Sequence, residues 1–431
     1  MNQLQLFLPC AAGVEDFLAE EVHALTGLVG QDLLTRRGGV MVRSSWRDCL
    51  RLNLHSRLAQ RVLVQLSYTE YRTEQDLYRA ASAVAWEVWF TPRQSIKVEV
   101  TAQHSPLNSL NFAALKIKDA VCDRFRDKAQ GVRPDVNTQW PDVRIFAHLT
   151  TDTCSLYIDT SGEPLFKRGW REDKGEAPLK ETLAAAMLAA CGWASGDGAG
   201  DLLPLYDPCC GSGTIAIEAA QIACHIAPGS LRHFAFEKYL PFQPHVWNAI
   251  RQEAAEAVCK PAGLSVPLVY GSDVSHRMVD FAQRNAERAG VADVIEFRGG
   301  DALQRMPPCA RPGLMLLNPP YGERIAVGGV AGARAGRGAA EASPDADGSR
   351  SARESAITAD GGEFFSQLAT HWKKHYPGWT GWILTPDLKL PGSMRLKESR
   401  RVPLWNGPIE CRLFRFDMFA GKRTTAQRRA E

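Results

Sequence analysis

Four consecutive residues, Asn318-Pro319-Pro320-Tyr321, could do chemistry on a nitrogen atom. An amino group conjugated to an aromatic ring is a poor nucleophile, because its lone pair is delocalised into the ring. The side-chain oxygen of Asn318 and the carbonyl of Pro319 could each accept one N–H and return electron density to that nitrogen. Prolines keep these acceptors preorganised, and Tyr321 could stack on the base. The structural alternative is a rigid strand end, with Tyr321 packed at its rim.

A second candidate site is a loop between an apolar strand at 202–206 and a helix at 215–224. Glycines let a backbone approach a ligand closely, and a helix N-terminus offers unpaired N–H groups. Tight turns also use glycine for steric reasons, so the spacing alone leaves both interpretations open. The residues that we assign to cofactor binding in this loop are Asp207, Pro208, Gly211, Gly213 and Thr214.

Acidic residues follow the next two expected strands as well. Asp273 comes after the strand at 267–272, where a carboxylate suits ribose hydroxyls. Asp301-Ala302 comes after the third strand, where Asp301 could accept the exocyclic amine of an adenine. A single Asp at a strand end is usually a helix cap. Ligands bind at the carboxyl ends of parallel strands, so three such loops in consecutive units predict one convergent site.

The order of the predicted strands and helices that must position these residues changes along the chain. Residues 1–65 read as a strand, a helix and a hairpin, which is typical of a small α+β unit, and residues 66–165 repeat this order. That second unit has expected strands at 96–100, 143–149 and 154–159 and a helix at 112–128. From about residue 180, strands and helices alternate, which predicts a parallel sheet covered on both faces.

Charge is a weak guide to partners in this chain. The 431 residues carry a net charge of +3, and residues 326–431 hold 17 Lys and Arg against 11 Asp and Glu. The expected helix at 112–128 is also basic, and it is either a solvated face or a phosphate-contacting surface. Its cations are Lys116, Lys118, Arg124, Arg126 and Lys128.

Composition limits the remaining possibilities. The 11 cysteines are scattered without zinc-ligand spacing, so we expect buried thiols in a reducing cytoplasm and no metal. The N-terminus lacks the layout of a signal peptide, and no apolar run is long enough to span a membrane. Residues 328–362 contain 18 Ala and Gly among 35 positions, which predicts a disordered insertion. Residues 421–431 form a basic tail.

Several of these motifs resemble those of a known family. The segments 207–214, 273, 301 and 318–321 are similar to the motifs of class I S-adenosylmethionine-dependent methyltransferases that modify an exocyclic or amide nitrogen. The segments 166–171 and 177–184 resemble the junction in bacterial RNA methyltransferases with an N-terminal THUMP domain. The segments 226–229, 234–238, 318–324 and 406–411 resemble the large-subunit ribosomal RNA guanine-N2 methyltransferases in particular.

The resemblance implies both a fold and a domain order. A ferredoxin-like α+β region (1–65) and a THUMP RNA-binding domain (66–165) would precede a Rossmann-like α/β methyltransferase domain (166–420). The long members of the family carry a second methyltransferase domain, which this chain is expected to lack. The Ala/Gly-rich insertion is not part of the family pattern.

The resemblance also implies direct transfer of a methyl group from S-adenosylmethionine to guanine N2 in 23S ribosomal RNA, without a metal. Asp207, Gly211 and Gly213 would hold the methionine end, Asp273 the ribose and Asp301 the adenine. Guanine-N2 methylation of transfer RNA and adenine-N6 methylation remain alternatives. Glutamine methylation of release factors is disfavoured by the RNA module, and a non-catalytic ribosome-assembly factor by the intact motifs. The modified position and the oligomeric state are not predicted.

Overall fold

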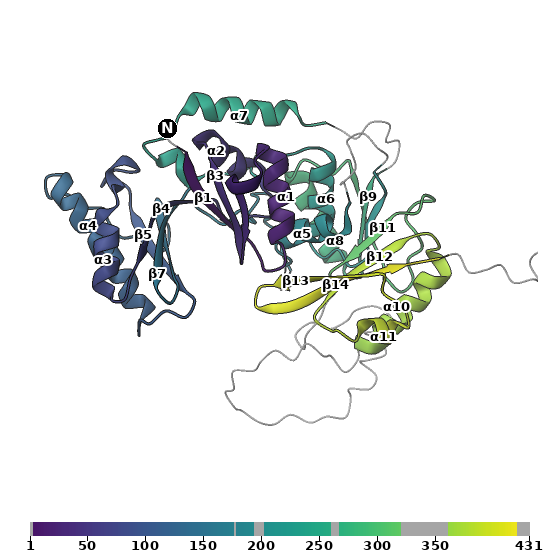
Figure 1. The fold of residues 1–431 in the computed structure, drawn as a ribbon. Helices are drawn as coiled ribbons and strands as arrows, with labels where there is room; N and C mark the ends of the chain where they lie inside the picture. The colour runs from purple at the N-terminus through teal and green to yellow at the C-terminus, as the bar shows by residue number, and fades with distance from the viewer. Residues whose placement is uncertain (1–2, 176–177, 194–201, 260–266, 320–360, 420–431) are drawn as a thin grey trace, which may run out of the picture. The chain divides into compact units, whose positions relative to one another are not determined.

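The computed structural model describes residues 3–175, 178–193, 202–259, 267–319 and 361–419 (Figure 1). The chain divides into two compact units. Unit 1 comprises residues 1–169 and 227–257, and unit 2 comprises residues 170–226 and 258–431. The expected insertion lies outside the described residues except for its last two positions, and the basic tail lies wholly outside them. No helix in the described parts of the chain is both long and apolar enough to cross a membrane.

The first half of unit 1 has the order βαββαβ. Its elements are β1 (Leu4–Pro9), α1 (Glu15–Thr26), β2 (Leu33–Arg36), β3 (Gly39–Ser44), α2 (Trp46–His55) and β4 (Leu63–Glu70). Alternate residues of the strands, such as Leu6 and Leu8 in β1 and Val40 and Val42 in β3, are completely buried. This period of two places one face of the sheet against the helices and leaves the other face without that cover.

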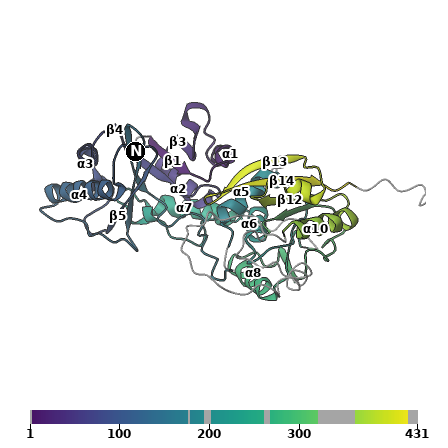
Figure 2. The same ribbon diagram turned by 90° about the horizontal axis from the view of Figure 1, so that it is seen from below.

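The second half of unit 1 extends the same sheet. It contains α3 (Glu74–Ala83), β5 (Ile96–Ala102), α4 (Leu110–Lys128), β6 (Val143–Leu149) and β7 (Thr153–Asp159). The seven strands follow the order β2-β3-β1-β4-β7-β6-β5, and β4 joins the two halves by pairing with both β1 and β7. Helices α3 and α4 lie side by side, as Figure 2 shows.

The basic helix α4 uses much of its charge within unit 1. Arg124 forms an ion pair with Glu87 at 2.6 Å and donates to the carbonyl of Ser82. Lys118 pairs with Asp119, and Arg126 pairs with Asp123. These contacts favour the structural interpretation of the helix over a free phosphate-contacting surface.

Residues 227–257 belong to unit 1, although they follow a helix of unit 2 in the chain. The amide of Gly229 donates to the carbonyl of Leu54, and the amide of Phe236 donates to the carbonyl of Thr160. Helix α7 (Pro244–Glu256) contacts α2. A short 3-10 helix, η3 (Ala235–Lys238), precedes α7 and supplies the buried ring of Phe236. This segment therefore completes the core of unit 1.

Unit 2 contains a second seven-stranded sheet, with the order β10-β9-β8-β11-β12-β14-β13. Strands β8 to β12 are parallel, and β14 and β13 close the edge in antiparallel pairing. The strands are β8 (Leu205–Asp207), β9 (Val269–Asp273), β10 (Ile295–Gly299), β11 (Leu314–Leu317), β12 (Thr380–Thr385), β13 (Arg400–Asn406) and β14 (Ile409–Asp417). This α/β arrangement after an α+β region confirms the expected fold class.

Helices cover both faces of this sheet. The helices are α5 (Glu181–Cys191), α6 (Thr214–Ala223), α8 (His276–Arg288), α10 (Gly361–His375) and α11 (Leu390–Met394). One face packs against α10 and α11 in an aromatic core that includes Trp372, Tyr376 and Phe414. Residues of opposite parity on the strands, such as Leu205 and Val269, face away from that core. Helices α6 and α8 contact the sheet through strands β8 to β10.

The start of the strand before the glycine loop differs from the prediction. We expected the strand before the glycine loop at 202–206, but β8 begins only at Leu205. Pro204 has no N–H to donate, so the ladder starts with the amide of Leu205, which bonds the carbonyl of Leu268. The strand ends at Asp207, which therefore lies within β8.

Candidate active site

The loop after β8 turns sharply into α6. The amide of Cys209 donates to Oδ1 of Asp207 at 3.0 Å, and the amide of Gly213 donates to the carbonyl of Cys210 at 2.8 Å. Gly211 and Gly213 have φ values of +53° and +87°, in the left-handed region that favours glycine. The loop thus needs both glycines for its shape, and α6 begins directly behind it at Thr214.

The two glycines meet different surroundings. A Cβ at Gly213 would lie 3.0 Å from the Cβ of Ala282 and 3.2 Å from Cζ of Phe297. A Cβ at Gly211 would have no atom of the described chain within 4 Å. Gly213 is therefore required for packing, whereas Gly211 borders open space at the carboxyl end of the sheet.

The loops after β8, β9 and β10 are tied together by hydrogen bonds. Oδ2 of Asp273 accepts the amide of Gly211 at 3.0 Å, and the amide of Cys210 bonds the carbonyl of Ser272. The amide of Gly300, next to Asp301, bonds the backbone carbonyl of Asp273 at 3.0 Å. The structure thus brings together the three acidic loops that we predicted to converge.

Each of the three acids also shapes its own loop. Oδ1 of Asp207, Asp273 and Asp301 accepts the amide two residues further on, at 2.9–3.0 Å. These bonds resemble the turns by which Asp commonly ends a strand. Pro208 and Ala302 are buried beside them. These acids are therefore not the helix caps that we considered, since the N-caps of α6 and α8 are Gly213 and Ser275, and the turns orient the carboxylates at this edge.

Burial shifts the pKa of two carboxyls at this edge of the sheet. It raises the pKa of Asp207 to about 8, with a smaller contribution from the negative charge of Asp273. Burial also raises the pKa of Asp273. A carboxyl whose pKa is raised by burial ionises more readily beside a cation. The site therefore suits a positively charged ligand.

Asn318 and Pro319 follow β11 at the same edge. Strand β11 pairs with β8 in parallel, with Leu314 opposite Leu205, so Asn318 lies just beyond the level of Asp207. Oδ1 of Asn318 is buried and has no hydrogen-bond partner among the described residues. A buried carbonyl oxygen without a donor is costly, and it is satisfied when a ligand N–H reaches it. Pro320 and Tyr321 lie outside the described residues.

Arg171 is a residue of this site to which we assigned no role from the sequence. Its guanidinium donates to Oε1 of Glu181 at 2.7 Å, to Oγ of Ser212 at 2.9 Å and to Oγ1 of Thr214 at 2.7 Å. It therefore connects α5 to the glycine loop and to the first turn of α6. Only the position of Arg171 in the junction motif could have pointed to it.

The cysteines of the loop are not nucleophiles. Burial raises the pKa of Cys209 and Cys210 well above the ordinary value, with further increases from nearby carboxylates. Both thiols are therefore protonated at neutral pH. Within the described ranges, no three His, Cys, Asp or Glu side chains gather as metal ligands would.

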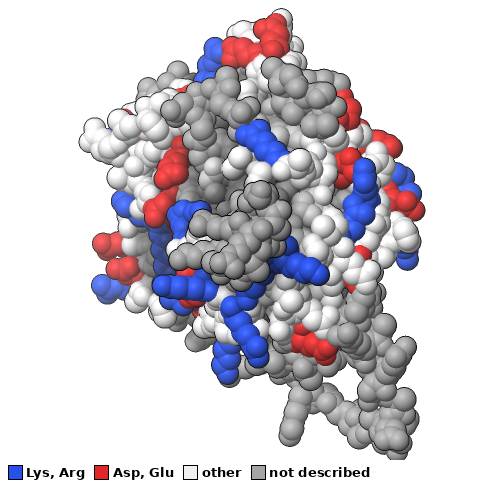
Figure 3. Space-filling model, turned by 90° about the vertical axis from the view of Figure 1, so that its right-hand side faces the viewer, with Lys and Arg blue, Asp and Glu red and all other residues white. Residues whose placement is uncertain are grey.

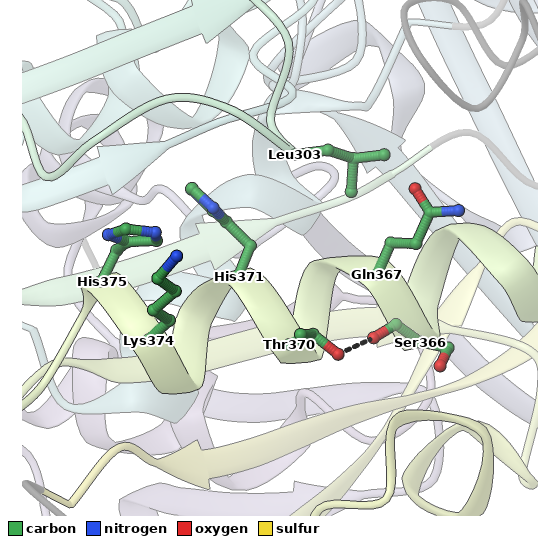
Figure 4. A pocket seen from close by; sticks show the side chains of 7 residues that line it. All are labelled: Leu303, Ser366, Gln367, Thr370, His371, Lys374 and His375. Carbon is green, nitrogen blue, oxygen red and sulfur yellow. Dashed lines mark hydrogen bonds between the residues drawn. The ribbon is translucent and has the colours of Figure 1, made fainter.

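A separate pocket lies along α10, and Figure 4 shows the side chains that line it. They are Leu303, Ser366, Gln367, Thr370, His371, Lys374 and His375. The rings of His371 and His375 are 4.8 Å apart, and Nε2 of His371 lies 2.6 Å from the carbonyl oxygen of Arg305. None of the predicted site residues lines this pocket.

The C-terminal surplus of positive charge is partly described. Residues 361–419 carry nine Lys and Arg against five Asp and Glu. On the face shown in Figure 3, Lys and Arg side chains gather toward the lower centre. Two of the arginines on β14 are paired, Arg412 with Glu410 and Arg415 with Asp417.

Three family models match the chain in succession. Residues 5–63 match the RlmL ferredoxin-like domain, residues 71–159 match the THUMP domain, and residues 168–331 match the RMKL-like methyltransferase domain. These matches agree with the two halves of unit 1 and with the glycine and acidic loops of unit 2.

Curated relatives match nearly the whole chain. The ribosomal RNA large subunit methyltransferase K/L of Shewanella amazonensis is 36% identical over 406 residues, which are 94% of this chain and 52% of that protein. The protein of the same name from Psychromonas ingrahamii is 34% identical over 95% of this chain and 49% of its own length. The chain thus spans about half the length of these relatives.

Solved structures agree with this relationship. SMU.472, which is assigned as a methyltransferase and was solved with S-adenosylhomocysteine, is 26% identical with a TM-score of 0.78, over 99% of this chain and all of its own. A predicted N6-adenine-specific DNA methylase from Listeria monocytogenes is 27% identical with a TM-score of 0.77, over 96% of both chains. The chain therefore combines an RlmL-type ferredoxin-like domain, a THUMP domain and an RMKL-like methyltransferase domain, and it is homologous to the N-terminal half of the K/L enzymes.

Proposed function

We propose that this protein transfers a methyl group from S-adenosylmethionine to the exocyclic N2 of a guanine in large-subunit ribosomal RNA. The observation that carries the proposal is the buried Oδ1 of Asn318, which lacks a partner among the described residues at the carboxyl edge of the sheet. The names of the K/L relatives and the THUMP match support RNA as the substrate class.

The residues of unit 2 fit the cofactor. S-adenosylmethionine supplies an electrophilic methyl group on a positively charged sulfur. Gly211 borders open space where a backbone can approach the methionine end, and Asp207, with its raised pKa, gains from a nearby cation. Asp273 and Asp301, at the ends of β9 and β10, would hold the ribose and the adenine.

The residues after β11 would act on the guanine. Oδ1 of Asn318 and the carbonyl of Pro319 accept the two N–H groups of the exocyclic amine, which keeps the nitrogen lone pair available and aimed at the methyl group. The amine loses a proton as its new bond forms, and Asn318, the Pro319 carbonyl or water receives it. A paired base cannot enter such a site, so the guanine must be flipped out or already unpaired.

Replacement of Asn318 tests this mechanism. We expect Asn318→Ala to lower kcat by about 10²–10³-fold, as loss of one preorganised polar contact does, while the affinity for S-adenosylhomocysteine stays nearly unchanged. Asn318→Gln is the matched control for chemistry against position, because it keeps the amide but moves it by one methylene. Full activity in Asn318→Ala would contradict the mechanism.

Mass spectrometry of RNA identifies the substrate. Ribosomal and transfer RNA from a strain without the protein would be compared with RNA from its parent. We expect one N2-methylguanosine to be lost from the large-subunit RNA. Loss from transfer RNA, or loss of N6-methyladenosine, would move the assignment to the corresponding alternative.

A further inference from the structure

The sheet of unit 1 carries a band of apolar and aromatic side chains on the face opposite its helices. Residues directly opposite each other on paired strands share a face. Phe7 of β1 pairs with Met41 of β3, and Met41 also pairs with Leu34 of β2. Across β4, the ring of Phe7 lies 6.0 Å from that of Tyr157, and Tyr157 pairs with Phe146 on β6. The band thus crosses the sheet from β2 to β6.

This band is accessible at several points. Phe7, Met41 and Phe146 are half-buried and Leu34 is 37% exposed, whereas Tyr157 between them is buried. Their neighbours of opposite parity, such as Leu6, are completely buried under the helices. The exposure belongs to this face of the sheet, so it is not a general property of the strands.

The ring of Phe7 lies close against the sheet. A Cβ added to Gly39, which belongs to the same face, would come within 2.8 Å of the ring carbons of Phe7. The glycine therefore leaves room for the ring to lie over the backbone, and the half-buried ring keeps an accessible side. Aromatic rings held in this way on a sheet are stacking platforms for unpaired bases.

Cations lie at both ends of the band. Arg36 and Arg43 are exposed beside Leu34 and Met41, and neither has an ion-pair partner among the described residues. At the other end, the guanidinium of Arg61, which is ion-paired with the buried Asp159, lies 5.0 Å from the centre of the Phe146 ring. Arg144 and Lys97 share Glu99 there. The cations at this second end are therefore ion-paired, and the positive charge available to a phosphate backbone comes from Arg36 and Arg43.

We infer that this face binds a single-stranded segment of RNA, with bases stacked on Phe7 and its neighbours and phosphates near Arg36 and Arg43. The inference rests on the proposed RNA substrate and adds the surface that holds it. A band across six strands at about 4.8 Å spacing is about 24 Å long, which exceeds the contact made by one flipped base. Unit 1 would thus bind the nucleotides that flank the target guanine.

Binding of a short oligonucleotide tests the inference. The probe is a fluorescent oligo(U) of about 12 nucleotides, titrated with the full chain at fixed salt, and a duplex of the same length is the comparison. We expect Arg36→Glu with Arg43→Glu to weaken oligo(U) binding at least about tenfold and to flatten its salt dependence. Phe7→Leu, which keeps an apolar side chain but removes the ring, should weaken it about fivefold or more.

The matched control is Arg79→Glu on α3, whose arginine side chain is 71% exposed on the helical side of the same unit. Equal affinities in the control and in both face variants would overturn the inference. Photo-crosslinking with 4-thiouridine adds a direct readout. Crosslinks within residues 4–9 or 33–44 would support it, and crosslinks confined to the helices would overturn it.

Methylation of ribosomal RNA, measured in parallel, separates this inference from the proposed function. If the wild-type chain methylates no RNA but the face variants still lose oligo(U) binding, the proposed function fails and the surface stands. If methylation is normal and the variants bind oligo(U) as the control does, the function stands and the surface is wrong.

Discussion

At the scale of single residues, Asp207 couples cofactor binding to protons. Burial raises its pKa to about 8, so at pH 7 the carboxyl is mostly protonated before the ligand arrives. A cationic cofactor favours the ionised form and lowers this pKa. Binding below pH 8 therefore releases a proton, and affinity should rise with pH, by up to about tenfold per unit, until it levels off near pH 8.

Calorimetry of S-adenosylmethionine binding checks this prediction. Titrations in buffers with different ionisation heats should report proton release at pH 6.5 and almost none at pH 9. Asp207→Asn cannot ionise, so its affinity should be nearly independent of pH. Proton uptake by the wild type, or an unchanged pH profile in the variant, would contradict the assignment of Asp207.

Arg171 and Glu181 form a buried ion pair beside the glycine loop, and their effect on stability can be separated from that of each partner. Their side chains are 13% and 4% exposed. Removing one partner of such a pair typically costs about 3–5 kcal/mol, because the other charge stays buried, whereas removing both can be nearly neutral. We therefore expect Arg171→Met to destabilise unit 2 by that amount and Glu181→Gln to restore much of it.

The pH dependence of stability provides a second test of this ion pair. Burial raises the pKa of Glu181, and Arg171 opposes that increase. Without Arg171 the carboxyl should take up a proton in the folded state, so the stability of Arg171→Met should be greatest at low pH and should fall as pH rises. Chemical denaturation at pH 5 and pH 8 measures both effects. An equal loss at both values, without rescue by Glu181→Gln, would show that the pair is not the cause.

At the scale of elements, alanine substitutions at the two glycines of the loop after β8 should have different effects. Both have positive φ, so alanine costs about 1–2 kcal/mol at either position. Gly213→Ala must also displace Ala282 or Phe297, which adds about 1–3 kcal/mol. Gly211→Ala meets no atom of the described chain, and its Cβ enters the space assigned to the cofactor.

We therefore expect Gly213→Ala to lower stability and Gly211→Ala to lower cofactor affinity, by about tenfold or more, with a smaller loss of stability. Denaturation and S-adenosylhomocysteine titration of the pair separate the two effects. If Gly211→Ala bound the ligand as tightly as the wild type, the open space beside it would not be the methionine site.

Elements with a strong local signal could be predicted from the sequence. Strand β6 alternates cleanly, so it has the predicted bounds of 143–149. The convergence of the acidic loops was also predictable, because the carboxyl ends of parallel strands share one edge. Strand β8 was placed incorrectly at its start, because its apolar run extends across Pro204.

Long-range contacts could not be predicted in this way. Arg171 reaches residues 41 and 43 positions away, and nothing in its local pattern specifies those partners. The pairing of β4 with β7 joins strands almost a hundred residues apart, and it converts two apparent α+β units into one sheet. Neither contact has a periodicity that a sequence window could detect.

At the scale of the whole molecule, the chain passes between its two units three times, after residues 169, 226 and 257. Unit 1 therefore cannot complete its core until residue 257 has been synthesised, although its sheet ends at Asp159. Arg232 shows how firmly the returning segment is held, since its guanidinium bonds the carbonyls of Ser161, Glu163, Pro164 and Lys167. Folding of unit 1 thus depends on a segment that interrupts the sequence of unit 2.

Matched tryptophan substitutions test whether the returning segment supports unit 1 alone. Trp247 on α7 is 4% exposed and packs edge-on against Phe236 at 5.0 Å, while Trp372 on α10 is 1% exposed in the core of unit 2. Each change to Ala should lower the stability of its unit by about 3–5 kcal/mol.

S-adenosylhomocysteine stabilises only the unit that binds it, so in calorimetry it should raise the transition temperature of unit 2. We expect Trp247→Ala to lower the other transition and to leave ligand affinity intact, and Trp372→Ala to lower the transition that the ligand raises. If Trp247→Ala lowered the ligand-sensitive transition instead, residues 227–257 would belong energetically to unit 2, and the division of the chain proposed here would be wrong.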